Sequence, residues 1–293
     1  MSSATNNLAD KAMLVRLNIR QWSARTCDKK VTAEVNRDHG AAADAGRYNK
    51  CLLAKSALAD VKRTSGAART YHYSHTLPWR DDGARILPAA MFLEYTQGMR
   101  ALESEYWEAV NDLLANYDSL VDSARLRLNG MFKDTDYPPV HKLRGRFGWC
   151  TTIDPLPVAD DFRVTLGADD IHAIRASIES SLQDSIKAAT MDLWRRLVDA
   201  VSHCADRLAG RDDKGKPAVF RDSLIGNIQD LCGILPRLNL AGDIELDRFR
   251  AQVESALAGL QPGELRENQR ARADAAAEAK AIADKMSAYM GAL

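Results

Sequence analysis

A run of apolar residues between Ile171 and Leu208 constrains the fold of this chain more than any other feature of its sequence. Apolar side chains recur along this run about every 3.7 residues, which matches a straight or slightly right-handed α-helix better than the roughly 3.5 residues of a heptad coiled coil. The residues on this stripe are Ile171, Ile174, Ile178, Leu182, Ile186, Ala189, Leu193, Leu197, Val201, Cys204 and Leu208. Asp169 and Asp170 place negative charge at the amino end, and Gly210 follows the carboxyl end. We therefore expect one unbroken helix whose stripe faces other helices.

The composition indicates an ordinary soluble protein. Of the 293 residues, 46% are hydrophobic and 27% are charged, and no apolar run approaches the roughly 18 residues that a membrane-spanning helix needs. Residues 1–10 lack the basic start and apolar centre of a signal peptide. The five cysteines are widely scattered and form no C-x-x-C pair, which indicates reduced thiols. The expected location is the cytoplasm, without membrane contact.

The rest of the sequence combines several helical patterns with a few strand patterns. Residues 13–22 alternate apolar and polar side chains, while 147–153 and 162–166 are rich in aromatic and β-branched residues, so three strands are expected. Further helices are expected at 56–76, at 89–117 with a continuation to 128, at 220–235, at 243–260 and in the Ala-rich tail 264–293. The tail is weakly hydrophobic, so docking, fraying and a role in an oligomer all remain open for it.

These elements predict an α+β protein, predominantly α, with long helices packed on a small antiparallel sheet. We expect a basic α+β region at residues 1–167 and a helical region at 168–293, either as two domains or as one continuous domain.

Two short patterns resemble ligand sites, but each lacks a feature that the chemistry needs. Residues 210–217 have the spacing of a phosphate loop until Pro217, which replaces the Ser or Thr that would hold magnesium. His72 and His75 lie three residues apart on a predicted helix, but no third ligand follows at a fixed spacing. We therefore interpret the first segment as an exposed loop and the second as an exposed, basic, aromatic helix end.

Two other groups of residues also have simpler structural explanations. Cys204 beside His203 falls on the apolar stripe, which indicates a buried and unreactive thiol. The acidic pairs at 160–161 and 169–170 suit a strand boundary and a helix start, although carboxylate oxygens also bind divalent cations. The sequence thus predicts a non-enzymatic protein with no catalytic residue, no metal and no cofactor.

The chain has no net charge, but its basic residues are concentrated near the amino terminus. Residues 11–80 contain 14 Lys and Arg against 5 Asp and Glu, interleaved with aromatic residues. Positive charge follows phosphates and aromatic faces stack on unpaired bases, a combination that suits single-strand binding. The alternative is a solvated face that pairs with acidic helices elsewhere in the chain. The candidate nucleic-acid-binding residues are Arg16, Arg20, Lys29, Lys30, Arg47, Lys50, Lys62, Arg63, Tyr71 and Tyr73.

Five short segments together resemble a family of phage and mobile-element proteins that is described only as a domain of unknown function. They are the Trp22 region with Cys27-Asp28-Lys29-Lys30-Val31, Gly46-Arg47-Tyr48-Asn49-Lys50, Thr76-Leu77-Pro78-Trp79, Phe147-Gly148-Trp149 and Asp160-Asp161-Phe162-Arg163-Val164. The resemblance covers nearly the whole chain and carries no catalytic motif. It implies a genetic neighbourhood of recombination genes and of cobaltochelatase-type AAA+ ATPases, and a place in the cytoplasm of the host cell.

These observations leave three functions open. The leading expectation is a nucleic-acid-binding accessory in DNA replication or recombination, with single-stranded DNA as its partner. The alternatives are an adaptor or partner of an AAA+ ATPase, and a structural or assembly protein of the phage. Salt separates them, because binding to a strand weakens steeply with salt whereas an apolar protein contact does not. We also expect a homo-oligomer formed through a long helix or through the tail.

Overall fold

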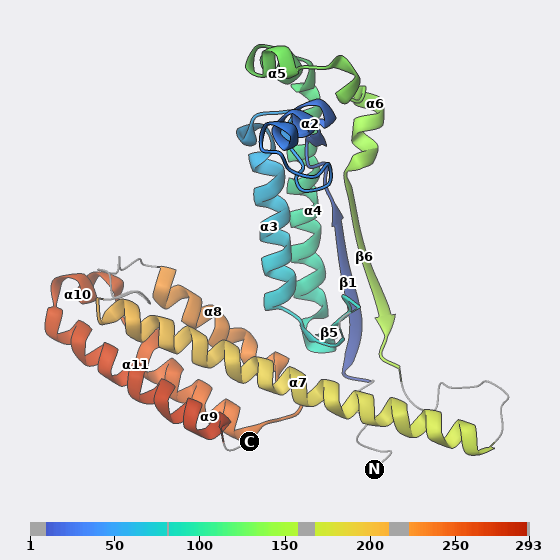
Figure 1. The fold of residues 1–293 in the computed structure, drawn as a ribbon. Coiled ribbons are helices and arrows are strands. Elements are labelled where there is room, and N and C mark those ends of the chain that lie inside the picture. The colour runs from blue at the N-terminus through green and yellow to red at the C-terminus, as the bar shows by residue number, and fades with distance from the viewer. Residues whose placement is uncertain (1–9, 81, 158–167, 211–222, 292–293) are drawn as a thin grey trace. The chain divides into compact units, whose positions relative to one another are not determined.

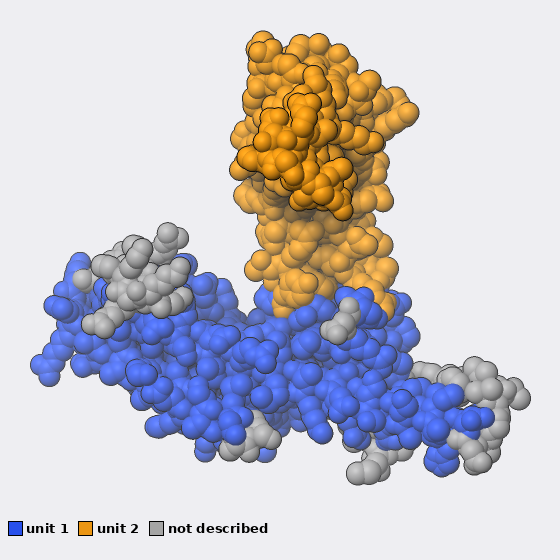
Figure 2. Space-filling view, in the orientation of Figure 1, with its two compact units in different colours: residues 1–15, 74–93, 153–293 blue, residues 16–73, 94–152 orange. Residues whose placement is uncertain are grey.

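The computed structural model describes residues 10–80, 82–157, 168–210 and 223–291, and these form a mainly helical α+β protein with a small antiparallel sheet. The predicted fold class is therefore confirmed. The chain divides into two compact units that alternate along the sequence (Figure 2). Unit 1 contains residues 1–15, 74–93 and 153–293, and unit 2 contains 16–73 and 94–152. This division differs from the expected boundary between 167 and 168, because the chain passes between the units four times.

The long predicted helix is confirmed as the axis of unit 1. Helix α7 runs without a break from Ala168 to Leu208 (Figure 1). Its stripe is half-buried over the first three isoleucines and is mostly buried from Leu182 onward. Trp194, which lies beside this stripe, is also fully buried. The carboxyl-terminal part of α7 therefore supplies most of the core of this unit.

Four further helices of unit 1 follow α7 in the sequence. They are α8 (Ser223–Leu238), α9 (Ile244–Val253) with a π-helical continuation (Glu254–Ala258), α10 (Pro262–Glu267) and α11 (Gln269–Met290). The Ala-rich tail docks: α11 lies along α7 and buries small residues such as Ala279 against it (Figure 1). Helix α8 was expected to end before Pro236 but continues to Leu238, because a proline in the last turn removes only one helical hydrogen bond.

A four-stranded sheet has the strand order β4-β5-β1-β6. The expected strands at 13–22 and 147–153 correspond to β1 (Ala12–Arg20) and β6 (Gly148–Pro155), and the one at 162–166 lies outside the described residues. Strands β4 (Leu77–Pro78) and β5 (Arg85–Pro88) pair as an antiparallel hairpin, but both are too short to show a period. Within unit 1, Arg196 of α7 donates hydrogen bonds to the carbonyl oxygens of Ser74 and Thr76, which ties the helix to the start of this hairpin.

Unit 2 is built on two antiparallel helices, α3 (Ala59–Ser74, preceded by a 3-10 turn at Lys55–Leu58) and α4 (Phe92–Ala115, preceded by one at Ala89–Met91) (Figure 1). Their hydrophobic core includes Val61, Tyr106 and Val110. The Tyr71 ring lies directly over Gly98, where an added Cβ would stand 2.3 Å from the Tyr71 hydroxyl oxygen. A glycine in the middle of α4 is therefore required by this close packing.

The remainder of unit 2 consists of short elements. Helix α5 (Tyr117–Leu128) ends at the residue to which a helical continuation was expected. Two 3-10 turns (Asn129–Met131 and Asp134–Asp136), α6 (Val140–Leu143) and a further turn (Arg144–Arg146) lead into β6. Strands β2 (Arg25–Cys27) and β3 (Asn49–Cys51) pair on either side of α2 (Lys29–Asp38) and a loop. We call β2, α2, the loop and β3 together the α2 lobe.

Candidate nucleic-acid interface

Lys50 is not available to a nucleic acid in this structure, contrary to the expectation from sequence. Its side chain is only 2% exposed, and its ammonium lies 3.2 Å from a carboxylate oxygen of Asp28 and 2.7 Å from one of Asp136. It also donates a hydrogen bond to the carbonyl oxygen of Met131. We therefore assign Lys50 a structural role in joining the α2 lobe to the turns that follow α5.

The ionised state of this buried cluster is stabilised by its own members. Burial alone would raise the pKa of the Asp28 carboxyl, but the backbone N–H of Val31 and the Lys50 ammonium hold that pKa below its usual value. Burial alone would lower the pKa of Lys50, but Asp136 and Asp28 raise it above the usual value. Asp28 also caps α2 by accepting hydrogen bonds from two backbone N–H groups. The charges of the cluster are thus used within the chain.

Two other candidates, Arg16 and Tyr71, differ from the exposed cations and aromatic rings that the sequence suggested, whereas a third, Tyr73, is exposed as expected. Arg16 is half-buried on β1 and has interactions of its own. The Tyr71 ring stacks on Tyr95 and its hydroxyl donates to the Glu94 carbonyl oxygen, so neither its face nor its hydroxyl is available to a base. Tyr73 is 54% exposed, although His72 contacts its ring at an edge.

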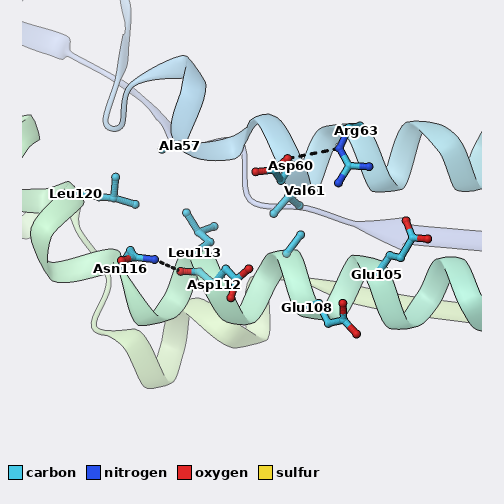
Figure 3. Close-up of a pocket in the computed structure, with 11 residues that line it drawn as sticks. Ala57, Asp60, Val61, Arg63, Glu105, Glu108, Asp112, Leu113, Asn116 and Leu120 are labelled. Atoms are coloured by element: carbon cyan, nitrogen blue, oxygen red, sulfur yellow. Dashed lines mark hydrogen bonds and ion pairs between the residues drawn. The ribbon is translucent and has the colours of Figure 1, made fainter.

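Arg63 lies in a negatively charged groove between α3 and α4 (Figure 3). Its guanidinium is 3.4 Å from Asp60, and the groove, of about 490 Å³, is also lined by Glu105, Glu108 and Asp112. Four carboxylates around one guanidinium repel a phosphate, so Arg63 does not belong to a nucleic-acid surface. We call this hollow the acidic groove.

Two of the candidates, Lys29 and Arg47, lie together at a second hollow beside α2. This hollow has a volume of about 640 Å³ and gains a third cation from Arg37, with Asp44 as its single carboxylate. Lys30 is exposed on the first turn of α2 and lies 3.9 Å from Glu34. Asn36 stabilises the hollow, since its buried amide donates to the Ala43 carbonyl oxygen. The α2 lobe therefore presents a cationic concavity.

The strongest cationic cluster of unit 2 surrounds Arg20 and includes arginines that the candidate set lacked. The Arg20 guanidinium donates to the Phe147 carbonyl oxygen at 3.4 Å and lies over Gly148, and Arg69 of α3 donates to the Ile19 carbonyl oxygen at 3.3 Å. Arg146 directly precedes Phe147. Arg69 thus contacts β1 one residue before Arg20, and Arg146 lies one residue before the carbonyl group that Arg20 contacts; all three side chains are exposed.

Tryptophan rings lie among these arginines. Arg144 lies over Trp107 at 5.1 Å from the ring centroid and donates to the Asn111 side chain. Trp107 and Trp149 pack on either side of Tyr106 at 5.4 and 5.6 Å, and the Tyr106 hydroxyl donates to the Arg20 carbonyl oxygen. Burial raises the pKa of Tyr106, while a backbone hydrogen bond from Gly148 and the positive charges of Arg69 and Arg20 act to lower it.

We name this cluster the arginine–tryptophan patch. It consists of Arg20, Arg69, Arg144, Arg146, Trp107 and Trp149. Two candidates from the sequence, Lys62 and Tyr73, extend the patch along α3. Both are exposed, and they lie seven residues before and four residues after Arg69, which places all three on one face of the helix.

A sequence signal for the missed residues does exist, in the distribution of carboxylates. The stretches 11–27, 61–80 and 137–153 contain no Asp or Glu, and each contributes at least one arginine to the patch. The charge count over 11–80 covered the first two stretches but not the third, which contains His141, Lys142, Arg144 and Arg146. Sequence alone does not show that these three stretches meet in space.

The other sequence motifs do not form reactive sites in the described part of the chain. His72 is buried and its Nδ1 lies 2.7 Å from the Tyr95 hydroxyl, and His75 is buried too, so the expected exposed helix end is incorrect. Burial raises the pKa of the Cys204 thiol to about 11, which disfavours its reactive thiolate. No group of three or more His, Cys, Asp or Glu side chains among the described residues is arranged to hold a metal. Residues 211–217 of the loop with phosphate-loop spacing, and Asp160 and Asp161, lie outside the described residues.

Comparisons with known proteins identify no relative. The sequence matches no protein-family model, and no curated protein and no solved structure is significantly similar to the chain. None of the helices that the structure describes is both long and apolar enough to cross a membrane.

Proposed function

We propose that this protein is a non-enzymatic nucleic-acid-binding accessory that contacts single-stranded DNA through the arginine–tryptophan patch of unit 2. The proposal is supported by exposed arginines from three sequence stretches without carboxylates, which are linked by the contacts of Arg20 with Phe147 and of Arg69 with Ile19 and lie beside two tryptophans. A role in DNA replication or recombination is part of the proposal, and it is supported by the resemblance of five short segments to phage and mobile-element proteins.

The chemistry of the patch suits a flexible, charged strand. Each guanidinium has five N–H donors, and the backbone contacts of Arg20 and Arg69 use one nitrogen each, so most of their donors remain for phosphate oxygens. These contacts also fix the direction of both side chains, which reduces the entropy lost on binding. Half-buried tryptophans can stack with bases of any sequence. We therefore expect binding that tolerates sequence and depends on salt.

Unit 2 as a whole favours an anionic partner. It contains 19 Lys and Arg against 14 Asp and Glu, so the unit has a net positive charge although the chain has none. The cationic hollow with Lys29, Arg37 and Arg47 supplies further phosphate contacts on the same unit. Such a charge distribution raises the rate of encounter with a polyanion.

The test is the salt dependence of binding to a labelled oligothymidine, measured by fluorescence anisotropy. For the Arg20→Ala, Arg69→Ala, Arg146→Ala triple variant, we expect weaker binding and a salt slope smaller by about two units, since each lost single-strand contact lowers it by roughly 0.7. The control is Arg25→Ala, Lys55→Ala, Arg63→Ala, which removes the same charge from exposed positions outside the patch. Equal losses in the two variants would remove the patch from the proposal, and no DNA binding by the intact protein at low salt would overturn it.

A further inference from the structure

Most carboxylates of the acidic groove come from a stretch of α4 that contains no Lys or Arg. Between Arg100 and Arg125 there are six Asp and Glu and no Lys or Arg. In the part of the chain that the structure describes, none of these six carboxylates makes an ion pair with a Lys or Arg side chain. Their charge is therefore not neutralised by the basic residues of unit 2, which was the alternative considered from the sequence.

The groove combines this charge with an apolar floor. Val61, Ala109 and Leu113 line the groove together with the carboxylates, and Figure 3 shows Val61 and Leu113 between α3 and α4. The ion pair between Arg63 and Asp60 is exposed and contributes little, so it does not close the groove. A hollow with apolar groups below and carboxylates around it is complementary to a short segment that carries an apolar side chain among cations.

One segment of this chain has that composition. Residues 140–146 carry His141, Lys142, Arg144 and Arg146, all exposed, together with the exposed apolar side chain of Val140. No Asp or Glu occurs from residue 137 to residue 153. Helix α6 and the turn that follows it fix the segment in a compact form, which limits the entropy lost on docking.

The segment does not fill the groove of its own chain. Arg144 is held by Trp107 and Asn111 on α4, whereas the groove is lined by Glu105, Glu108 and Asp112 of the same helix. At about 100° per residue, Trp107 and Asn111 lie on a side of α4 well away from the middle of the carboxylate set. The two complementary surfaces of unit 2 are thus separated on one helix and can meet only between molecules.

We propose that the acidic groove of one molecule receives the segment 140–146 of a second copy of this chain. The two contacting surfaces are different, so each docked copy keeps one free groove and one free segment and the assembly can extend. Ion pairs between exposed side chains are weak and are screened by salt, so the contact is weak, reversible and sensitive to salt. This inference rests on the groove and its complement and does not require the proposed DNA binding.

The test is the weight-average mass of the full chain by sedimentation as protein concentration rises. We expect the mass to increase at about 0.01 M salt, where the Debye length is about 30 Å, and the increase to disappear at about 1 M, where it is about 3 Å. Glu105→Lys with Glu108→Lys should weaken self-association by roughly tenfold or more, because attraction becomes repulsion at two positions. Lys142→Glu with Arg146→Glu should have the same effect from the other side of the contact.

Mixing the two double variants provides the decisive measurement. Each variant then meets a partner of opposite charge at both contacts, so association should return to near its original strength. Asp118→Lys with Asp122→Lys is the matched control, since it makes the same charge change on exposed α5 residues outside the groove and should leave association unchanged. A chain that stays monomeric at low salt, a mixture that does not recover, or a control as weak as the groove variant would each overturn the proposal.

The outcome is independent of the test for DNA. The groove variant and the Asp118→Lys, Asp122→Lys control add the same charge and leave the arginine–tryptophan patch unchanged, so the two should bind oligothymidine equally. DNA binding by an intact chain that stays monomeric at low salt overturns only the self-association proposal, and self-association without DNA binding overturns only the proposed function.

Discussion

The two units reach a stable structure by different means. In unit 1, α7 provides a long apolar surface against which α8, α9 and α11 pack. In unit 2, a hydrophobic core is combined with a buried ion cluster, and the two buried ionised side chains among the described residues, Asp28 and Lys50, both belong to this unit. Unit 1 is thus stabilised mainly by the apolar stripe of one long helix. Unit 2 also contains buried charged side chains, and it carries both candidate interfaces.

The largest effect on stability is expected in unit 1 from Trp194→Ala. Trp194 is fully buried, packs at 5.6 Å from the Phe249 ring and at 5.1 Å from the Tyr289 ring, and donates a hydrogen bond to Asp243. Removing the ring leaves a cavity, so the free energy of unfolding should fall by about 4 kcal/mol. Hydrogen exchange read by mass spectrometry should show faster exchange in α7, α9 and α11 and unchanged exchange in α4.

Trp194→Phe is the matched control for this substitution. It keeps most of the buried ring but removes the N–H that Asp243 accepts, so a loss near 1 kcal/mol is expected. Equal acceleration of exchange in α4 would show that the units unfold together and would contradict the comparison.

The second effect is expected in unit 2 from Lys50→Met. This change removes the cation from two carboxylates without exposing them, and breaking a buried pair in this way costs about 3 kcal/mol. Urea unfolding should show the loss, and exchange should accelerate in α2 and β3 while α7 remains protected. Lys29→Met, at an exposed position on the same lobe, should change the free energy of unfolding by less than about 0.5 kcal/mol.

The contrast also explains which features the sequence could predict. The stripe of α7 was predicted correctly because burial against other helices follows the period of the helix itself. Strand β1 was predicted because its residues alternate with the period of a strand, and β6 because its stretch is rich in aromatic and β-branched residues. Strands β4 and β5 were missed, because two and four residues are too few to show a period. Fully buried Trp194 was also missed, since it lies beside the apolar stripe.

The candidate site was predicted less well, because it depends on contacts between distant parts of the sequence. A count of basic residues treats them all alike, although their surroundings differ. Lys50 forms a buried ion pair with Asp136, which lies 86 positions away, and Arg63 lies next to carboxylates from α4. The arginine–tryptophan patch needs β1, α3 and the segment before β6 to meet, and no local pattern encodes that meeting. Long acid-free stretches indicate which residues are able to contribute to such a patch, but not which of them do.

The smallest effect is a difference in the alkaline pH at which the two units lose stability. In unit 1, burial raises the pKa of the Cys204 thiol and of the Cys232 thiol from 9.0 to about 11. In unit 2, burial raises the pKa of the Tyr117 hydroxyl from 10.0 to about 12, and the carboxylates of Asp136 and Asp28 raise that of Lys50 above 10.5. A group whose pKa is raised by folding keeps its proton longer in the folded state, so its contribution is complete below the unfolded pKa and is lost as pH rises toward the folded one.

Unit 1 should therefore begin to lose stability above pH 9.0, and unit 2 only above pH 10.0. At acidic pH the order reverses. Folding lowers the pKa of Asp28, so this carboxylate stabilises unit 2 fully above pH 3.8, and the stabilisation is lost as pH falls through the pKa of the folded state. Urea titrations with exchange read separately in α7 and α4 should show α7 opening first between these alkaline limits. Cys204→Ala should reduce this early loss in α7, because the buried thiol that must ionise is no longer present. If α4 opens at the same pH as α7 in the unmodified protein, the thiols do not set the alkaline limit of unit 1.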